Sequence, residues 1–395
     1  MSWIRRRPSK PVLQADPQLS EERFVESERL RLQAEATVAH LQERLAALAT
    51  STQSAATEDR GTAQAGPEKP LPQARGASKL LVIGSQRTNY AELFAGQTVH
   101  GKVVQVEQCR WDELSLCSQG RGGLLASIAP SAKPLPNTNQ ARGRSFQPDF
   151  VLLRAGCMGG FRVDWRHMLS VLAHSGVGAV NSVESFIASQ DKALVYGRLR
   201  AVQRRLGGDF PLIVQDCYSD WRAATFPPDM PTVAKVGTAS GGLGKMRVRD
   251  ADDWRDFCGC CAMQPQYFTS EPFVEWVADV RVQKIGSHVR AVRRTGKDWK
   301  ANMDASPQDE DVAVEPRWRK WVDAAARALG ADICALDLLC AQSKEGVPSE
   351  HILEVNSSAI GLVRRHAEED ERRIRDLVLQ RMAGEGEGAL SEVDD

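Results

Sequence analysis

The sequence predicts an α/β protein in which an open α/β domain is followed by an α+β domain. Apolar runs that alternate with a helical stretch predict the open α/β domain over residues 79–181. Over residues 182–383, neighbouring apolar runs joined by short glycine turns predict antiparallel pairs packed with helices. The chain has 395 residues, of which 42% are hydrophobic, enough for two cores.

The first domain begins at KLLVIG, residues 79–84. An apolar run that ends in a glycine turn is typical of a buried parallel strand. The sequence predicts a helix over residues 164–175 and a long surface loop over residues 126–145. Further strands are predicted within residues 98–108, 148–156 and 176–182.

The second domain mixes strands and helices without regular alternation. Helices are predicted over residues 191–206, 252–263, 318–329 and 368–382. Strands are predicted within residues 211–217, 232–237, 245–250, 266–276, 279–286, 287–294, 331–340 and 351–358.

The ends of the chain differ from these domains in composition. Residues 1–18 form a basic arm, residues 51–78 read as a flexible linker, and residues 384–395 form an acidic tail. Residues 19–50 predict a helix, either a short coiled coil with a partner or a solvated helix. Its apolar stripe consists of Ala34, Val38, Leu41, Leu45 and Leu48.

Composition also bounds the function. The formal net charge is zero, so no overall field favours nucleic acid, and we expect no nucleic-acid partner. Nine cysteines, an odd number, without a secretory signal favour a reduced, cytoplasmic protein. Cys258, Cys260 and Cys261 lack nearby histidines, so we expect thiols packed on a helix rather than a zinc site.

The stretch TASGGLGKMRV, residues 238–248, is a candidate phosphate loop. Ala239 stands where a Walker loop needs glycine and Met246 where it needs Ser or Thr, so this motif is excluded. Both flanks are strand-like, which predicts a hairpin tip that donates backbone N–H groups to phosphate, with Lys235 and Lys192 as nearby cations. A plain hairpin without a ligand is the alternative.

Downstream, three oxygen donors form a candidate metal site. Glu354 and Asn356 are two residues apart on a predicted strand, so they share one face, and Asp337 lies on another strand. Two carboxylates and an amide suit Mg²⁺ that bridges nucleotide phosphates. The alternative is polar strand ends that face water.

The segment between the loop and the acids can hold a base and a phosphate. Backbone groups at residues 272–274 are positioned to read an adenine edge, with Phe273 or Val274 packed on the ring. Asp279, Arg281 and Gln283 share one face of a predicted strand. Arg281, Arg293 and Asn302 are candidates to contact a γ-phosphate or a second substrate; for Arg293 a solvated sheet face is an equal alternative.

These parts in this order resemble the ATP-grasp fold, and over residues 79–383 the chain resembles the synapsin family. LLVIGSQRTNYAELFAG, EPFVEWVADVRVQKIG and HILEVNSS are the longest matching runs. The resemblance implies a pre-ATP-grasp domain followed by a two-lobed ATP-grasp domain that binds ATP with Mg²⁺ or Ca²⁺. It also implies homodimers or larger oligomers and an association with vesicle membranes.

Family motifs assign roles to particular residues here. Asp337 and Glu354 match the metal-binding positions, and Asn356, which departs from the family's usual residue, completes the E-x-N of active ATP-grasp ligases. Glu271, Phe273 and Val274 match positions beside adenine. The matched cofactor-binding positions nearer the phosphates are Lys192, Lys235, Gly241, Gly242, Gly244 and Lys245, with Lys284 further along the chain.

The basic arm also resembles the family. MSWIRRRPSK repeats a pattern that in synapsins associates with membranes and is phosphorylated, so Ser9 is a candidate kinase site. Phosphate on Ser9 would weaken attraction to anionic lipid.

Two functions follow from these residues, and the sequence leaves enzyme activity open. The first is a regulatory ATP-binding protein on vesicle or membrane surfaces. The second is an ATP-dependent carboxylate–amine ligase that forms an acyl phosphate. A nucleotide-regulated scaffold acting through residues 19–50 is a third reading.

Overall fold

The computed structural model describes residues 76–384, except residues 85, 121–122, 132, 137, 160–162, 238–241, 264–265, 296–298, 300–307 and 343–345. The predictions for the basic arm, the helix over residues 19–50, nearly all of the linker, Ser9 and the acidic tail beyond Gly384 therefore lie outside the described residues. So do those for Gly241 and Asn302. The described residues belong to one compact unit.

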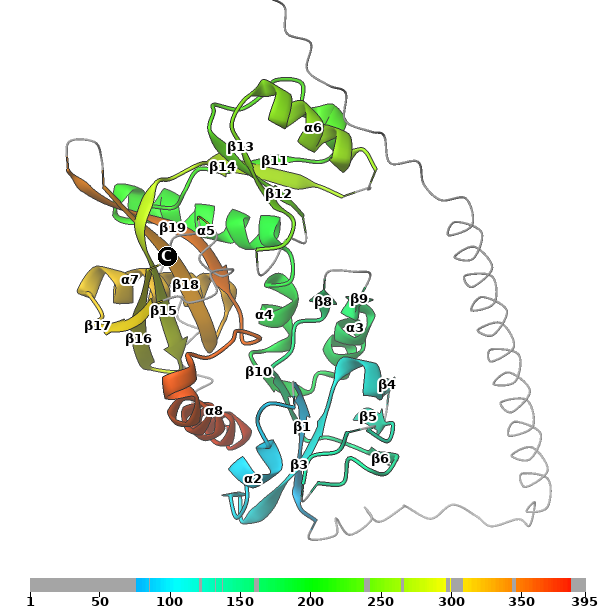
Figure 1. Ribbon diagram of the computed structural model, residues 1–395. Coiled ribbons are helices and arrows are strands. Elements are labelled where there is room, and N and C mark those ends of the chain that lie inside the picture. Colours follow the sequence, from blue (N-terminus) through cyan, green and yellow to red (C-terminus); the bar gives the residue numbers. More distant parts are fainter. Residues whose placement is uncertain are drawn as a thin grey trace, which may run out of the picture. The chain divides into compact units, whose positions relative to one another are not determined.

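The first sheet of this unit is mostly parallel, in the order β10-β7-β1-β3-β2 (Figure 1). Its strands are β1 (Ser78–Ile83), β2 (Thr98–Val99), β3 (Lys102–Cys109), β7 (Phe150–Leu153) and β10 (Gly178–Val180). Leu81 and Ile83 pack in one buried cluster and Leu80 and Val82 in another, so β1 is apolar on both faces as a central parallel strand requires. The helices are α2 (Tyr90–Leu93), α3 (Arg166–Ser175) and α4 (Val183–Ala188).

A three-stranded antiparallel sheet adjoins this first sheet and corrects one prediction. It consists of β4 (Leu114–Gln119), β5 (Gly123–Ile128) and β6 (Arg144–Phe146), after the 3₁₀ turn Trp111–Glu113. The predicted loop over residues 126–145 therefore begins and ends in strands. Ala126, Ile128 and Phe146 are buried, and this alternation was the missed signal. A short hairpin, β8 (Met158–Gly159) and β9 (Val163–Asp164), follows.

A four-stranded antiparallel sheet comes next, in the order β11-β14-β12-β13. Its strands are β11 (Asp216–Tyr218), β12 (Thr232–Val236), β13 (Lys245–Val248) and β14 (Phe268–Pro272), and α6 (Ala251–Cys261) follows β13. Trp254, Phe257 and Cys261 of α6 pack on Phe268. The predicted strand over residues 211–217 is shorter than expected; Leu212 instead forms an isolated parallel bridge with Ile352.

A five-stranded antiparallel sheet in the order β17-β16-β15-β18-β19 completes the unit. Its strands are β15 (Trp276–Ile285), β16 (His288–Thr295), β17 (Gln308–Val312), β18 (Ile333–Gln342) and β19 (Pro348–Asn356). The helices around it are α5 (Lys192–Leu206), α7 (Pro316–Leu329) and α8 (Ala367–Met382).

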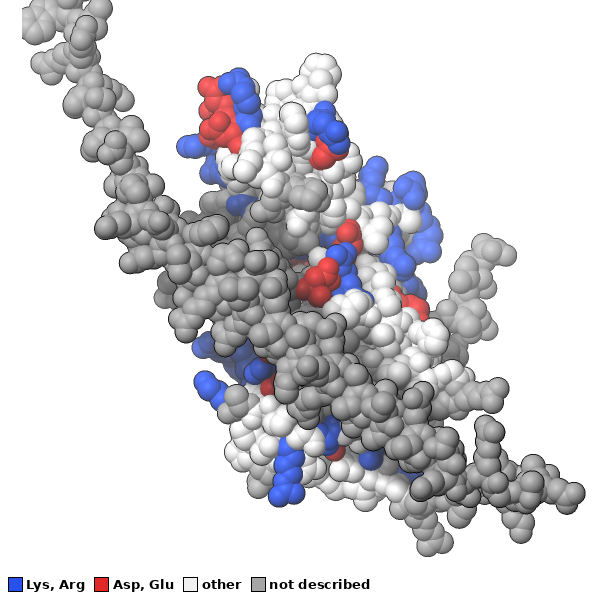
Figure 2. All heavy atoms as spheres, turned by 90° about the vertical axis from the view of Figure 1, so that its right-hand side faces the viewer, with Lys and Arg blue, Asp and Glu red and all other residues white. Residues whose placement is uncertain are grey.

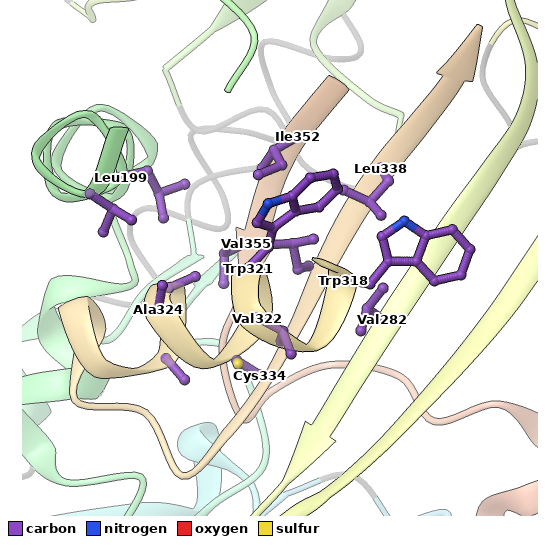
Figure 3. Close-up of a cluster of buried hydrophobic side chains, with 14 of the residues drawn as sticks. Leu199, Val282, Trp318, Trp321, Val322, Ala324, Cys334, Leu338, Ile352 and Val355 are labelled. Carbon is purple, nitrogen blue, oxygen red and sulfur yellow. The ribbon is translucent and has the colours of Figure 1, made fainter. Parts of the chain in front are cut away.

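One face of this sheet packs on α5 and α7. Figure 3 shows Trp318, Trp321 and Val322 of α7 against Val282 and Leu338 of the strands. Pro316 begins α7 and Gly330 ends it in the left-handed conformation, a common pair of helix boundaries. The opposite face is apolar at one end, where Ile285 and Ile333 pack with α8. Further along it is polar, because the cross-strand pairs Arg281–Asp337 and Asp337–Glu354 lie there.

Candidate functional site

A cavity of about 500 Å³ lies between the four-stranded and five-stranded sheets. Lys192 of α5, Lys235 of β12 and Glu354 of β19 line it, although they are far apart in the sequence. Asn356 of β19 and Arg281 of β15 also line it. The structure therefore brings together cations and oxygen donors that were predicted from separate motifs.

Lys192 and Lys235 are each held by a carboxylate. Lys192 is the first residue of α5, where the capping side chain of Asp191 accepts hydrogen bonds from Ala193 and Leu194. Its Nζ lies 2.5 Å from Glu354 Oε2. Lys235 Nζ lies 2.5 Å from Glu271 Oε1, and both side chains are almost fully buried. Without these acids two ammonium groups would stand unpaired in a cavity wall.

Lys245 joins this group across the hairpin. It pairs with Lys235 between β13 and β12, at the base of the glycine loop. Burial and the two other lysines lower the pKa of Lys245, while Glu354 opposes the shift. Burial alone would raise the pKa of Glu354, but Lys192, Lys245 and Lys235 outweigh it and hold that pKa well below its usual value. Three lysines thus gather around one carboxylate.

The strands on either side of the glycine loop, β12 and β13, pair antiparallel, as predicted from its flanks. Gly242 has φ 87° and Gly244 has φ 70°, which glycine adopts without strain. At the loop entrance, a Cβ on Gly237 would lie 2.8 Å from the carbonyl oxygen of Tyr267, so this position also requires glycine.

A second cavity of about 70 Å³ adjoins the first, and Lys235 and Leu353 line both. Glu271, Phe273 and Val274, which were predicted to border adenine, all line this smaller cavity, as do Gly242 and Lys245. The guanidinium of Arg247 lies 3.7 Å from the centre of the Phe273 ring, which fixes that aromatic side chain.

A β-bulge places Leu353 between the cavities. Asp337 pairs with Glu354, but the next residue, Leu338, pairs with Ile352, so Leu353 is an extra residue on β19. Ile352 and Val355 consequently both pack in the core beneath α7, while Leu353 and Glu354 both face the cavity. Bulges commonly redirect side chains beside functional sites.

The three predicted metal ligands lie on one face of β18 and β19. Asn356 Nδ2 donates to Asp337 Oδ2 over 2.9 Å, and Glu354 is the cross-strand partner of Asp337. Two carboxylates and an amide fit a hard cation that keeps waters and phosphate oxygens as its other ligands. Within the part of the chain that the structure describes, no group of three or more His, Cys, Asp or Glu side chains is placed to hold a metal ion.

Arg281 faces the cavity as predicted, but its guanidinium is bound to Asp337. Nε lies 2.8 Å from Oδ1 and Nη2 lies 2.9 Å from Oδ2. Arg294 lies beside this pair: its Nη2 contacts both oxygens of Asp279 at 2.8 Å and reaches Asp337 at 3.7 Å.

Two predicted residues lie on the other face, and their assignments to the site are corrected. Arg293 pairs with Val280, so it shares the α7 face and is exposed. Lys284 is also on the α7 face, where its Nζ binds Asp323 Oδ1 at 2.8 Å. Side chains alternate between the two faces of a sheet along a strand, and both residues lie on the face opposite to that of Arg281.

The first domain contributes one wall of the larger cavity through Gly156 and Met158. Just before them, Arg154 donates to the carbonyl oxygens of Ser358 and Ile360, in the segment that follows β19. This contact fixes the chain directly beyond Asn356. Arg154 and several lining residues were not predicted from sequence: Gln215, Tyr267, Trp276, Trp299 and Leu353.

Comparison with known proteins defines the class first. The fold resembles the ATP-grasp ligase PsnB in complex with a minimal precursor, with a TM-score of 0.50 and 14% identity over 77% of this chain and 99% of that one. It also resembles the macrocyclase MdnC of Microcystis aeruginosa MRC, with a TM-score of 0.50 and 13% identity over 76% of this chain and 99% of that one. At such identities the likeness shows the fold alone, an ATP-grasp fold, as predicted.

The family follows from sequence. Residues 73–179 match the synapsin pre-ATP-grasp domain, and residues 181–384 match the synapsin ATP-binding domain. Synapsin of Drosophila melanogaster is 32% identical over 313 residues, or 77% of this chain and 29% of that protein. The chain belongs to the synapsin family, as the resemblance predicted, although it aligns with less than a third of this relative's length.

Proposed function

We propose that this protein binds ATP together with a divalent cation in the cleft between the two antiparallel sheets. The observation that carries the proposal is the gathering of Lys192, Lys235 and Lys245 around Glu354, next to a small cavity lined by Phe273 and Val274. Polyphosphate needs several cations to offset the loss of water, and adenine needs an adjoining apolar slot.

Each group in the cleft has a proposed role. The smaller cavity takes adenine between Val274 and Leu353. The lysines and the loop around Gly242 and Gly244, together with Gly241, hold phosphates. Asp337, Glu354 and Asn356 hold Mg²⁺ or Ca²⁺, which when bound neutralises phosphate charge.

The regulatory and membrane-associated role is a further part of the proposal. It relies on family membership and on the basic residues 1–18, with Ser9 as a kinase site. On the face in Figure 2, acidic and basic side chains lie close together at several places. We assign lipid attraction to the basic arm. Within residues 76–384, gaps excepted, no helix is long and apolar enough to span a bilayer. Homo-oligomers and a cytoplasmic location complete this proposal.

A second candidate function is ATP-dependent ligation of a carboxylate to an amine. Asn356 beside Asp337 and Glu354, with Arg281 in the same wall, favours it, because these groups suit the charge of a transferring phosphoryl group. Asn302 was predicted to assist and remains a proposal. ADP release that depends on a carboxylate and an amine would support ligation; its absence across a broad metabolite panel would leave the binding protein.

Binding is tested by calorimetric titration of Mg²⁺ and ATP into the full chain and into Glu354→Gln. We expect saturable binding to the wild type and at least about a tenfold loss in the variant, because the three lysines and the cation lose their shared partner. Lys284→Met, on the opposite face of the sheet, is the matched control and should bind as the wild type does. Equal affinity in all three proteins would contradict the proposal.

A further inference from the structure

Asp337 has no free oxygen in this structure, although it is one of the proposed metal ligands. Arg281 donates to both of its oxygens, at 2.8 and 2.9 Å, and Asn356 donates to Oδ2 at 2.9 Å. The Asp337 side chain is 4% exposed and that of Arg281 is 17% exposed, so water scarcely competes for the pair. An arginine side chain keeps its charge in proteins, so the pair is ionic.

We propose that Arg281 is the residue that makes metal binding at Asp337 conditional on nucleotide. Its guanidinium pairs with the Asp337 carboxylate until a phosphate group bound in the cavity replaces that carboxylate as its partner. This inference rests on the proposed nucleotide site and adds the residue that couples its two ligands.

The geometry makes Asp337 a poor metal ligand while Arg281 is in place. A divalent cation contacts carboxylate oxygens directly, and three of the roughly four lone pairs of Asp337 already accept N–H groups. A metal beside the fixed guanidinium would also place two positive charges close together in a site with little water.

The cavity offers Arg281 a second anion. Arg281 lines the same cavity as Lys192 and Lys235, and a guanidinium binds phosphate by the same two-pronged contact that it makes with carboxylate. A polyphosphate drawn in by the lysines can therefore replace Asp337 as its partner. Lys192 is less suited to the same control, because its side chain is 31% exposed and the contact of its ammonium among the described residues is with one oxygen, Glu354 Oε2.

The test is Mn²⁺ binding to the full chain, followed by electron paramagnetic resonance with and without a non-hydrolysable ATP analogue. In the absence of nucleotide, Arg281→Met should bind Mn²⁺ about tenfold more tightly than the wild type. The factor by which nucleotide increases Mn²⁺ affinity should be about tenfold smaller in this variant than in the wild type. Arg281→Met/Asp337→Asn should lose the gain. Lys284→Met removes another cation of β15, one that pairs with Asp323 of α7, and should bind Mn²⁺ as the wild type does.

A thermal-denaturation measurement checks separately that the variant is folded. Arg281→Met removes the two-pronged partner of the buried Asp337 carboxylate and leaves it, among the described residues, only Asn356 and the more distant Arg294. Mn²⁺ alone should therefore raise the melting temperature of the variant but not that of the wild type. Arg281→Lys keeps the charge but not the two-pronged contact, so the rise of its melting temperature with Mn²⁺ should lie between those of Arg281→Met and the wild type. Wild-type Mn²⁺ affinity in both Arg281 variants would overturn the inference. Failure of the wild type to bind the nucleotide would instead contradict the proposed function.

Discussion

The two faces of the five-stranded sheet are made by the same strands and differ in purpose. Toward α7, Val280, Val282 and Leu338 are fully buried against tryptophans. On the other face, Arg281 and Asp337 occupy the intervening positions, at the cost of removing charges from water. Alternation along a strand thus lets a stabilising face and a binding face be one residue apart, and each can be altered without the other.

The largest expected effect is on the apolar face. Trp321→Ala removes a buried side chain from the cluster in Figure 3 and should lower the free energy of unfolding by about 3–5 kcal/mol. Urea denaturation measures this loss. At low temperature, where the variant is folded, its ATP affinity should equal that of the wild type; a large loss of affinity would mean that the two faces are not independent.

Nearly as large is the effect of breaking one buried pair in the cleft. Lys235→Met leaves the buried Glu271 without its ion-pair partner, which should cost about 3–5 kcal/mol of stability. Lys235→Met/Glu271→Gln should recover most of that stability in thermal denaturation. It should still lose ATP binding, because the phosphate-binding ammonium is gone. Recovery of both properties would refute a role for Lys235 in the site.

The bulge allows a sharper comparison between neighbouring residues. Ile352→Ala opens a cavity in the core and should cost about 2–5 kcal/mol of stability. Leu353→Ala removes a wall of both cavities and should instead weaken ATP binding by about tenfold, from lost apolar contact with the base. Denaturation and calorimetry on both variants check this. The reverse pattern would contradict the assignment of faces.

A smaller effect concerns pH. Burial and the neighbouring lysines lower the pKa of Lys245, and phosphate binds the protonated form. Affinity is therefore full below that pKa and falls as the pH rises through it, starting at a lower pH than for an ordinary lysine. Lys245→Arg, which stays charged, should flatten the decline when calorimetry is repeated across the alkaline range. An unchanged decline would assign it to another group.

The sequence anticipated much of this cleft because its periodicity is local. The shared face of Asp279 and Arg281 and that of Glu354 and Asn356 follow from spacing alone. The register of strand pairing does not follow from spacing. Arg293 and Arg294 are adjacent, so neither can be assigned to a face without knowing the partner strand; of the two, Arg294 lies beside Asp337.

The other features that were not predicted from the sequence also depend on residues far apart in the chain. The bulge at Leu353 shows only in the pairing of β18 with β19, because apolar residues at 352, 353 and 355 fit several alternations. Arg154 is about two hundred residues from the segment after β19 that it binds, and no local pattern predicts this contact. Asp337 was predicted as a metal ligand and Arg281 as a contact for a γ-phosphate or a second substrate, but the ion pair between them was not predicted.

The most direct test is a crystal structure of the full chain with Mg²⁺ and a non-hydrolysable ATP analogue. Phosphate oxygens should lie within hydrogen-bonding distance of Lys192 and Lys235, the cation should contact Asp337 and Glu354, and Arg281 should have left Asp337. Nucleotide bound elsewhere, with the lysine–carboxylate pairs and the Arg281–Asp337 pair intact, would contradict the account.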